Sequence, residues 1–373
     1  MLKRVNICRA LCFLLLLSGT TLFCSGKSKP ISVRVDSFAV ISPAVIKTFS
    51  ERGRKGLYAQ QLSAVLSAAQ ADLDATPHPI VRVHTAGSLP TDPWFKESVE
   101  ARRDWTKMLD MGLAYRITGD KRYIEAESRF MNAWLDVYKI SLQPIDESPF
   151  EQVILAYDLV RSDLSPETMQ RMDVFLRSMA TGYIDYIKAE KKEDIFNFQS
   201  HRLKLALLSS YSVGDPDLIA TGLALYRHHL EGNLLAGNVV GDFPKRDALH
   251  YAVYDLEPLL TVALAAKMHG VDVFNSRNHV GSSLKGAMDW LAPYTRGEQT
   301  HEEFVHSDTE FDRTRAKAGM AEYSGTWQPR YSMHLYAIAS NLSDDYLPFY
   351  KMLEVKYGHH GDEWLIALKD AGL

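Results

Sequence analysis

Apolar residues recur at helical spacing along most of this sequence, and this periodicity constrains the fold more than any other feature. Residues 57–74, LYAQQLSAVLSAAQADLD, carry apolar side chains at positions 57, 58, 62, 65, 66 and 69, which share one helix face. The pattern also predicts helices over residues 95–118, 121–139, 148–161, 165–189, 199–213, 216–235, 256–269, 280–293 and 332–340, with two more near the end. Strand and helix patterns do not alternate, so we expect an all-α chain.

Short turns separate these predicted helices, for example TGD at residues 118–120 and VGDPD at residues 213–217. Turns this short join antiparallel neighbours. A hydrophobic content of 46% in 373 residues is enough for one large core. We therefore expect a single domain over residues 27–373, an (α/α) toroid or incomplete barrel of antiparallel helix hairpins, with some β character at residues 32–41.

The first 26 residues have the pattern of a secretory signal peptide. Lys3, Arg4 and Arg9 precede an apolar run at residues 10–17, and small or polar residues follow near residues 25–26. The apolar run is shorter than the about 20 residues that cross a bilayer, so no membrane span is expected. We predict a periplasmic or secreted bacterial protein.

All three cysteines, Cys8, Cys12 and Cys24, lie within this leader, so the mature chain is predicted to contain no disulfide. Cys24 is a candidate lipid anchor of an outer-membrane lipoprotein. The three residues before it, TLF, make a poor lipidation signal, because the residue preceding a lipidated cysteine is normally small.

Ionisable side chains are concentrated in KRDALHYAVYDLEP, residues 245–258. Pro258 fits the first turn of a helix, and Asp255 is suited to cap a helix that begins at residue 256. Tyr254 then precedes this helix, either as a hydrophobic staple against Leu259 or as part of an active site. This segment alone leaves both interpretations open.

A second polar cluster lies in NFQSHRLKLALL, residues 197–208, at the predicted start of a helix. Amide and imidazole groups at a helix start can donate to an anion, with support from the helix dipole. The polar side chains are Asn197, Gln199, Ser200 and His201. On this segment alone, ordinary helix capping is the favoured explanation for them.

A third segment, HEEFVHSDTEFDRTRAKAG at residues 301–319, is rich in histidine and acidic residues. The spacing of five between His301 and His306 does not fit the HExxH zinc motif. Neither the His228–His229 pair nor the His359–His360 pair has carboxylates at ligand spacing. We therefore expect neither a metal nor another cofactor.

Together these three segments resemble the alginate lyase family of helical polysaccharide lyases. In that family an Asn-His pair opens one helix, and an Arg followed by AL.Y..Y comes later in the chain. Here SH stands at residues 200–201 and ALHYAVY at residues 248–254, with 254 − 201 = 53 positions between His201 and Tyr254. The resemblance covers most of the mature chain and includes AYDL at residues 156–159.

This sequence departs from the family pattern at two positions. Ser200 stands where the family has Asn, so Gln199 or Asn197 must supply the amide. Asp247 stands where the family has Arg, and Arg246 lies one position earlier. These departures indicate a divergent branch that cuts mannuronan or glucuronan.

The resemblance implies β-elimination on an anionic polysaccharide. A base removes the C5 proton, an acid protonates the leaving oxygen O4, and nearby donors neutralise the uronate carboxylate. One Tyr can do both proton transfers on mannuronate or glucuronate, provided that cations such as Arg246 or His250 lower its pKa from about 10. Catalytic roles are assigned to Tyr254 (with Tyr251 as the reserve), His201, Arg246 and Gln199, and substrate binding to Asn197, Ser200, His250, Tyr251, Lys245 and Arg315.

The formal net charge of −4 excludes a broad basic field, so no nucleic-acid partner is expected. A polyuronate must be met by local cations. The candidates are Arg102, Arg103, Lys245, Arg246, Arg313, Arg315 and Arg330. Sugar faces could stack on Trp105, Trp134, Trp290 or Trp327, although tryptophan is more often a core residue.

Two other function classes stay open from the sequence. A glycoside hydrolase on the same type of fold would work with two carboxylates. The acidic residues available for it are Asp146, Glu147, Asp194 and Asp242. A non-catalytic periplasmic glycan-binding protein is the third class, and the departures at Ser200 and Asp247 favour it.

Overall fold

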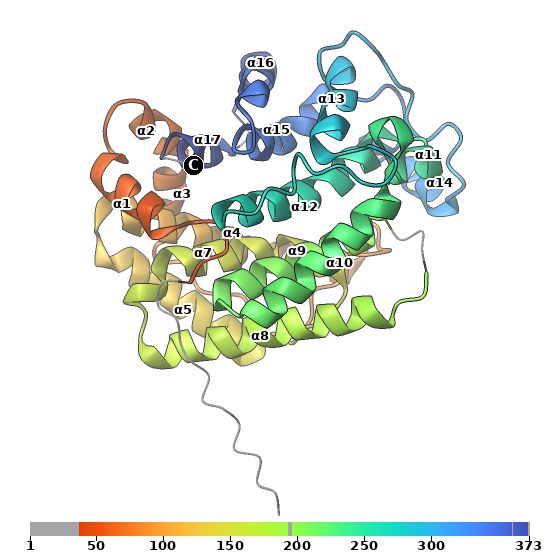
Figure 1. Ribbon diagram of the computed structural model, residues 1–373. Helices are drawn as coiled ribbons and strands as arrows, with labels where there is room; N and C mark the ends of the chain where they lie inside the picture. Colours follow the sequence, from red (N-terminus) through yellow and green to blue (C-terminus); the bar gives the residue numbers. More distant parts are fainter. Residues whose placement is uncertain (1–36, 193–195, 360, 372–373) are drawn as a thin grey trace, which may run out of the picture. The chain divides into compact units, whose positions relative to one another are not determined.

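Helices form nearly all of the regular structure in the computed structural model, which describes residues 37–192, 196–359 and 361–371. The predicted all-α fold is confirmed (Figure 1). Residues 33–373 form one compact unit. The predicted leader, residues 1–26 with its three cysteines, lies outside the described residues.

Within the described residues, six short 3₁₀ turns and a two-stranded ribbon accompany the helices. Leu234 of β1 pairs with Val240 of β2 in antiparallel register. The helices are α1 (Pro43–Arg52), α2 (Gly56–Gln61), α3 (Ser63–Asp72), α4 (Pro93–Thr118), α5 (Lys121–Val137), α6 (Pro144–Glu147), α7 (Glu151–Val160), α8 (Pro166–Ala189), α9 (Phe196–Val213), α10 (Pro216–Asn233), α11 (Asp242–Arg246), α12 (Leu249–Met268), α13 (Leu284–Thr295), α14 (Glu310–Lys317), α15 (Met333–Ser340), α16 (Leu347–Tyr357) and α17 (Glu363–Asp370). The strands are β1 (Leu234–Leu235) and β2 (Val239–Val240).

Consecutive long helices pack against each other as hairpins, and the short turns between them explain why. At the end of α4, Gly119 adopts a left-handed φ of 71°, and its N–H donates to the Tyr115 carbonyl. Asp120 then caps α5 by accepting from the backbone N–H of Arg122. The α9–α10 hairpin forms in the same way, with Gly214 at a left-handed φ of 64° and Asp215 as the cap of α10.

Helix α9 lies at the centre of the fold, between α8, α10 and α12 (Figure 1). It is buried along almost its whole length, on all faces, from Asn197 to Val213. A helix buried on all faces loses the polar stripe of a surface helix, which explains its weak amphipathic pattern. Polar groups in α9 therefore lie inside the protein, where each needs a partner.

The start of α12 differs from the prediction. The helix begins at Leu249 instead of residue 256, because a side chain distant in the sequence caps it. The Glu303 carboxylate accepts from the backbone N–H groups of Leu249 (2.8 Å) and His250 (3.0 Å). Asp255 is not the cap, and Pro258 lies in the helix interior. Tyr254 is therefore a residue of the helix and does not precede it.

Several smaller elements also differ from expectation. Residues 37–41 form no strand, so the described part of the segment with predicted β character is irregular. Helix α1 was not predicted; Ser42 caps it by accepting from the N–H of Val45, and Pro43 occupies its first position. Helix α14 was not predicted either, because its sequence is mostly charged.

Three of the four tryptophans considered for sugar stacking are core residues. Trp105 is fully buried and packs edge-on against Trp134 and Phe150. Trp327 is also buried. Trp290 is partly buried and packs edge-on against Phe243. The stacking interpretation is therefore wrong for the buried three, because their rings are covered by protein.

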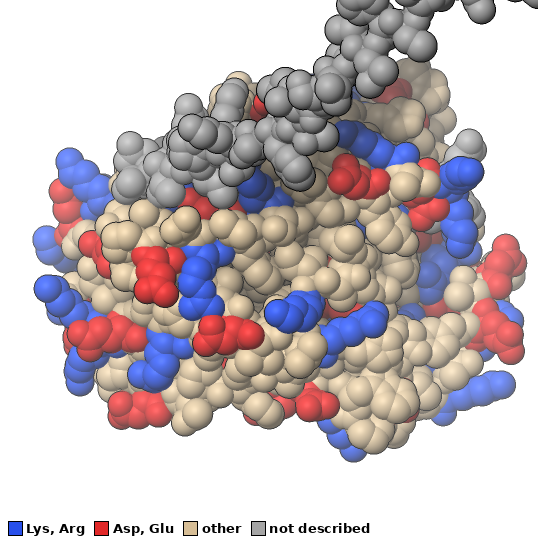
Figure 2. Space-filling model, turned by 90° about the horizontal axis from the view of Figure 1, so that it is seen from below, with Lys and Arg blue, Asp and Glu red and all other residues tan. Residues whose placement is uncertain are grey.

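Charged side chains of both signs are interspersed on the face shown in Figure 2, with apolar and uncharged surface between them. This agrees with the formal net charge of −4. Among the described residues, no helix is both long and apolar enough to cross a bilayer.

Candidate active site

A cleft of about 630 Å³ brings together side chains from α4, α7, α9, α12, α14 and the segments near them. It contains ionisable residues from all three segments singled out in the sequence, although only Arg315 comes from residues 301–319. Its polar lining includes Arg102, Ser148, Glu151, Asn197, His201, Lys204, Arg246, His250, Tyr251, Tyr254, Glu257, Arg315, Tyr323 and His334.

His201 of α9 and Tyr254 of α12 are in direct contact in this cleft. Their ring centroids are 4.4 Å apart, with the planes inclined by 49°. Only 2% of His201 is exposed, whereas Tyr254 is partly buried. Burial and the nearby Lys204 ammonium hold the pKa of His201 well below its usual range, so the imidazole is neutral.

Burial raises the pKa of Tyr254 above its ordinary value, and the neighbouring Tyr251 and Glu257 act in the same direction. The phenol is therefore protonated at neutral pH. Arg102 and Arg315 act in the opposite direction and favour the phenolate. The cations that act on Tyr254 are thus Arg102 and Arg315, and not the predicted Arg246 and His250.

His250 does not act as a cation. Burial, Arg315 and Arg246 lower its pKa to about 4, so its ring is neutral at physiological pH. The ring lies 5.3 Å from that of Tyr251 and 6.5 Å from that of Tyr254, between centroids. His250 therefore contributes an aromatic, uncharged wall beside the two tyrosines.

Two arginines converge on the hydroxyl side of Tyr251. Arg315 donates to the Tyr251 hydroxyl at 2.8 Å, and the Arg246 guanidinium lies 3.6 Å from the centre of the ring. Asp312, which is fully buried, accepts from Arg246 Nε at 2.8 Å and lies 3.9 Å from Arg315. The Asp312 carboxylate thus holds both guanidinium groups beside the cleft.

The departure at position 247 has a structural explanation. Asp247 adopts a left-handed φ of 49° in the turn between α11 and α12. Its carboxylate accepts from the backbone N–H of His306 at 2.8 Å and lies 3.4 Å from His301. Asp247 therefore anchors the loop at residues 301–306, whereas Arg246 lines the cleft.

Asn197 and His201 are one helical turn apart on α9, and both line the cleft. The Asn197 amide donates to Asp242 at 2.8 Å, and its buried Oδ1 has no hydrogen-bond partner among the described residues. Both residues therefore lie in the cleft, and the roles assigned to them stay predictions.

Gln199 and Ser200 lie on other faces of α9, so the structure does not place them where their predicted roles require. Gln199 accepts from Arg202 at 3.2 Å and lines a separate pocket with His229. Ser200 is fully buried and donates to the inner carboxylate of Asp255. Successive helix residues point about 100° apart, so neighbours of His201 in sequence need not share its face.

Lys245 is also absent from the cleft lining. Its ammonium lies 5.5 Å from the centre of the Phe196 ring. Of the other cations proposed to line a groove, Arg102 lines the cleft. Arg103 instead pairs with Glu100 at 2.8 Å on the surface.

Acidic and basic side chains also line the cleft together. Glu151 and Glu257 line it together with His334, which is partly buried. Although burial opposes the charged form of His334, Asp362 and then Glu257 outweigh it and raise its pKa to about 9. Burial raises the pKa of Glu257 as well. The cleft is thus cationic beside Tyr251 and mixed in charge beyond Tyr254.

Of the carboxylates considered for glycoside hydrolysis, the three that the structure describes do not line the cleft. Asp146 and Glu147 are fully buried and accept from the Thr85 N–H (2.6 Å) and the Tyr138 hydroxyl (2.7 Å), respectively. Asp242 is buried beneath Asn197, and Asp194 lies outside the described residues. The described three are structural, because each accepts hydrogen bonds from neighbouring groups of the protein.

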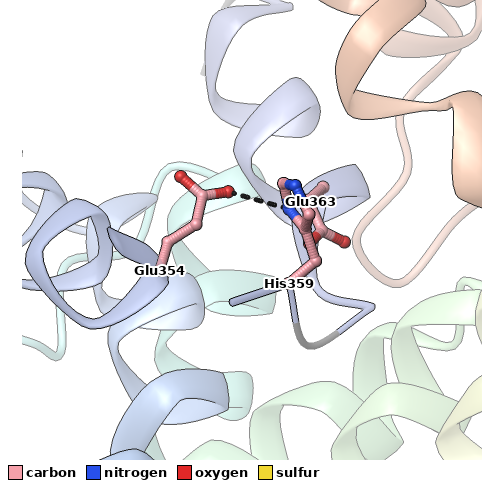
Figure 3. Close-up of side chains that lie close together, drawn as sticks. All are labelled: Glu354, His359 and Glu363. Atoms are coloured by element: carbon pink, nitrogen blue, oxygen red, sulfur yellow. Dashed lines mark hydrogen bonds and ion pairs between the residues drawn. The ribbon is translucent and has the colours of Figure 1, made fainter. Parts of the chain in front are cut away.

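Figure 3 shows a group of potential metal ligands on α16, α17 and the segment between them. Glu354, His359 and Glu363 each offer one ligand atom within 4.8 Å of the others. His359 Nδ1 lies 2.9 Å from Glu363 and 3.4 Å from Glu354. None of the three lines the cleft, so the group is separate from the candidate active site.

A family model described as alginate lyase matches residues 54–301, which is more than half of the chain. The match includes both α9 and the start of α12, which carry His201 and Tyr254. This chain belongs to the alginate lyase family. One curated relative, a "Polysaccharide lyase" of Stenotrophomonas maltophilia (strain K279a), is 25% identical over 203 residues. That match covers 50% of this chain and only 61% of the relative.

Solved structures of alginate lyases have the same fold. An alginate lyase from Bacteroides ovatus superposes with a TM-score of 0.64 at 16% identity, over 91% of this chain and 98% of that one. Alginate lyase A1-III from Sphingomonas species A1 gives 0.52 at 17% identity, over 73% and 82%. A histidine-to-alanine variant of A1-III complexed with a tetrasaccharide gives 0.55 at 18% identity, over 70% and 79%. These likenesses confirm the predicted (α/α) toroid for this alginate lyase family member.

Proposed function

We propose that this protein is a polysaccharide lyase that cleaves a polyuronate by β-elimination and leaves a 4,5-unsaturated uronide end. The observation that carries the proposal is the contact between Tyr254 and His201 in a cleft also lined by Arg102, Arg246 and Arg315. A phenol that can exchange a proton, beside several donors for a carboxylate, is what this elimination requires.

Neutralising the uronate carboxylate is the first requirement, because the C5 proton is only weakly acidic while that carboxylate is fully charged. Arg246 and Arg315 are suited to this, since guanidinium groups bind carboxylates through paired hydrogen bonds. Both are already held beside Tyr251 by Asp312. His201 adds a neutral imidazole on the opposite helix.

The proton transfers are assigned to Tyr254. As a phenolate stabilised by Arg102 and Arg315, its oxygen takes the C5 proton. The electrons of the C5–H bond form the C4–C5 double bond, and the C4–O4 bond breaks with its electron pair on O4. Tyr254 then gives the proton to O4 and is again a phenolate, so the step balances without another reactant.

A single base and acid of this kind favours D-mannuronate or D-glucuronate, in which the C5 proton and O4 lie on the same face of the ring. Guluronate presents them on opposite faces. We therefore propose mannuronan, mannuronate-rich alginate or glucuronan as the substrate. Faster cleavage of polyguluronate than of polymannuronate and glucuronan would contradict this preference.

A panel of polyuronates tests the activity itself. A lyase raises the ultraviolet absorbance as unsaturated ends form, together with new reducing ends. A glycoside hydrolase would give reducing ends without this absorbance, and a glycan-binding protein would give neither. Either of these two outcomes would overturn the proposal.

We also propose that the protein is exported to the periplasm or the medium, as the leader pattern at residues 1–26 predicts. Fractionation of cells that express the full chain tests this location. Radiolabelling with palmitate, with Cys24→Ala as the control, decides whether Cys24 carries a lipid.

A further inference from the structure

A buried chain of polar groups leads from the wall of the cleft to His201. Lys204 Nζ lies 2.5 Å from Glu151 Oε2 and donates to Ser148 Oγ at 2.8 Å. Ser148 Oγ lies 2.6 Å from His201 Nδ1. Ser148 is 7% exposed and Lys204 4%, so bulk water has little access to these contacts.

The donor and acceptor chemistry of this chain fixes the position of one proton. An ammonium group can only donate, so Ser148 Oγ uses a lone pair towards Lys204. The Ser148 hydroxyl proton is then available for His201 Nδ1. If His201 instead carried its proton on Nδ1, Ser148 Oγ would accept hydrogen bonds from both Lys204 and His201. The Ser148 hydroxyl proton would then have no acceptor among the described residues. Buried hydroxyl groups are rarely left in that state.

The other side of the imidazole supports the same assignment. Pro258 has no N–H, so the Tyr254 carbonyl lacks the usual partner four residues later in α12. This carbonyl favours a proton on the His201 ring, and the buried Nε2 has no hydrogen-bond partner among the described residues. Ser148 occupies Nδ1, so the Tyr254 carbonyl faces the remaining nitrogen, Nε2. A carbonyl oxygen accepts hydrogen bonds, so it favours an N–H at Nε2 over an unprotonated nitrogen.

We propose that Ser148 and Lys204 are positioning residues that hold His201 as the Nε2–H tautomer. His201 is then a hydrogen-bond donor in the cleft and cannot serve as the base, which leaves that role to Tyr254. Glu151 contributes indirectly, by fixing the Lys204 ammonium against Ser148. This inference rests on the proposed lyase function only for its catalytic consequence, because the tautomer is a property of the protein without substrate.

Nitrogen NMR of the full chain labelled with ¹⁵N-histidine tests the tautomer directly. The two signals that disappear in His201→Gln identify this residue among the 13 histidines. We expect Nδ1 with the shift of an unprotonated nitrogen and Nε2 with that of a protonated one. The reverse assignment would overturn the proposal, whether or not the protein cleaves any polyuronate.

Variants test the consequence for turnover. Ser148→Ala should give a mixture of tautomers and lower kcat roughly 10–100-fold, the usual cost of losing a hydrogen bond that orients a functional histidine. Ser148→Thr keeps the hydroxyl and should restore most of the activity and the single tautomer. Lys204→Met should broaden the tautomer mixture like Ser148→Ala.

Ser210→Ala is the matched control, because Ser210 is buried in the same helix as His201 and donates only to the Ala206 carbonyl. It should leave both kcat and the histidine signals unchanged. If Ser148→Ala retains the single Nε2–H tautomer with unchanged kcat, the positioning role is wrong. Should Ser148→Ala fail to fold, the NMR spectrum of the unmodified protein still decides the tautomer.

Discussion

The imidazole of His201 and the phenol of Tyr254 are in ring contact, although 53 positions separate them in the sequence. The contact forms because α9 and α12 pack side by side and each presents one polar ring at the same level. Neither ring is charged at neutral pH. In the proposed reaction, the neighbouring arginines therefore supply the charge.

Replacing Tyr254 with Phe removes one hydroxyl and keeps the ring contact with His201. Because a positioned acid–base group contributes roughly 10²–10⁴-fold, kcat should fall by at least 100-fold while the melting temperature stays the same. Turnover is followed by ultraviolet absorbance on the best polyuronate of the panel. Tyr251→Phe is the comparison variant. An active Tyr254→Phe beside an inactive Tyr251→Phe would move the base three residues upstream.

The raised pKa of Tyr254 predicts alkaline activation. The reactive phenolate is a minor species below that pKa, and its fraction grows tenfold with each pH unit. The value of kcat/KM should therefore rise steadily from pH 7 to pH 9. A bell-shaped profile with its maximum below pH 7 would argue against a tyrosine base. Arg102→Gln should lower kcat/KM across this range, since it removes one of the cations that favour the phenolate.

Asp312 is predicted to be essential for both the stability and the affinity of the cleft. Asp312→Asn leaves the Arg246 guanidinium beside Tyr251 without its buried partner. Breaking a buried ion pair costs about 3–5 kcal/mol, so the free energy of unfolding in urea should drop by that order. KM should also rise, because Arg246 and Arg315 lose their fixed positions. Asp308→Asn, an exposed neighbour, should change neither quantity.

Glu127 offers a test of stability against pH. Both of its carboxyl oxygens are buried without a partner among the described residues, and burial raises its pKa well above 4.5, the ordinary value. The folded protein thus keeps a proton that the unfolded chain loses as the pH rises. Its contribution to stability is most favourable below pH 4.5 and weakens as the pH rises.

Glu127→Gln removes this titration while keeping the shape of the side chain. The variant should be more stable than the native protein by about 1–3 kcal/mol at pH 8, and this gain should disappear towards pH 4. Melting temperatures at pH 4, 6 and 8 measure it. Glu125→Gln, on the exposed side of the same helix, is the control and should show no such trend. A gain that is equal at all three pH values would contradict the assignment.

The packing of α10 on α9 can be tested at two glycines of α10. A Cβ at Gly222 would lie 2.7 Å from Leu207 Cδ2 and 3.0 Å from its Cγ, whereas a Cβ at Gly232 would have no atom within 4 Å. Gly222→Ala should destabilise the protein by about 1–3 kcal/mol through overpacking. Gly232→Ala should be neutral or stabilise it by up to about 1 kcal/mol. Equal effects would show that the two helices can separate without cost.

The sequence was informative where structure depends on local patterns. Apolar periodicity and the glycine turns located α4, α5, α8 and α10 to within a few residues, since those signals act between neighbours in the chain. The start of α12 was missed because its cap, Glu303, lies 54 residues after Leu249. Because this cap comes from a distant segment, the sequence around residue 249 contains no capping signal that predicts the helix start.

The site shows the same limit. Tyr254, His201 and Arg246 share the cleft as expected. Gln199 and Ser200 point elsewhere. The direction of a side chain around the helix axis, and not its closeness to His201 in the sequence, decides which side chains meet. The contact from Lys204 to Ser148 was not predicted either. The two residues are 56 positions apart, and neither belongs to a recognisable motif.

Helix α14 supplies Asp312 and Arg315, yet it lies after residue 301, where the match to the family model ends. Helices α9 and α12, with His201 and Tyr254, lie within that match. Part of the cationic wall, Asp312 and Arg315, is thus encoded apart from the reacting groups, whereas Arg246 lies in the matched region with them. Mutation can remodel that wall for a different polymer while the inherited chemistry stays intact.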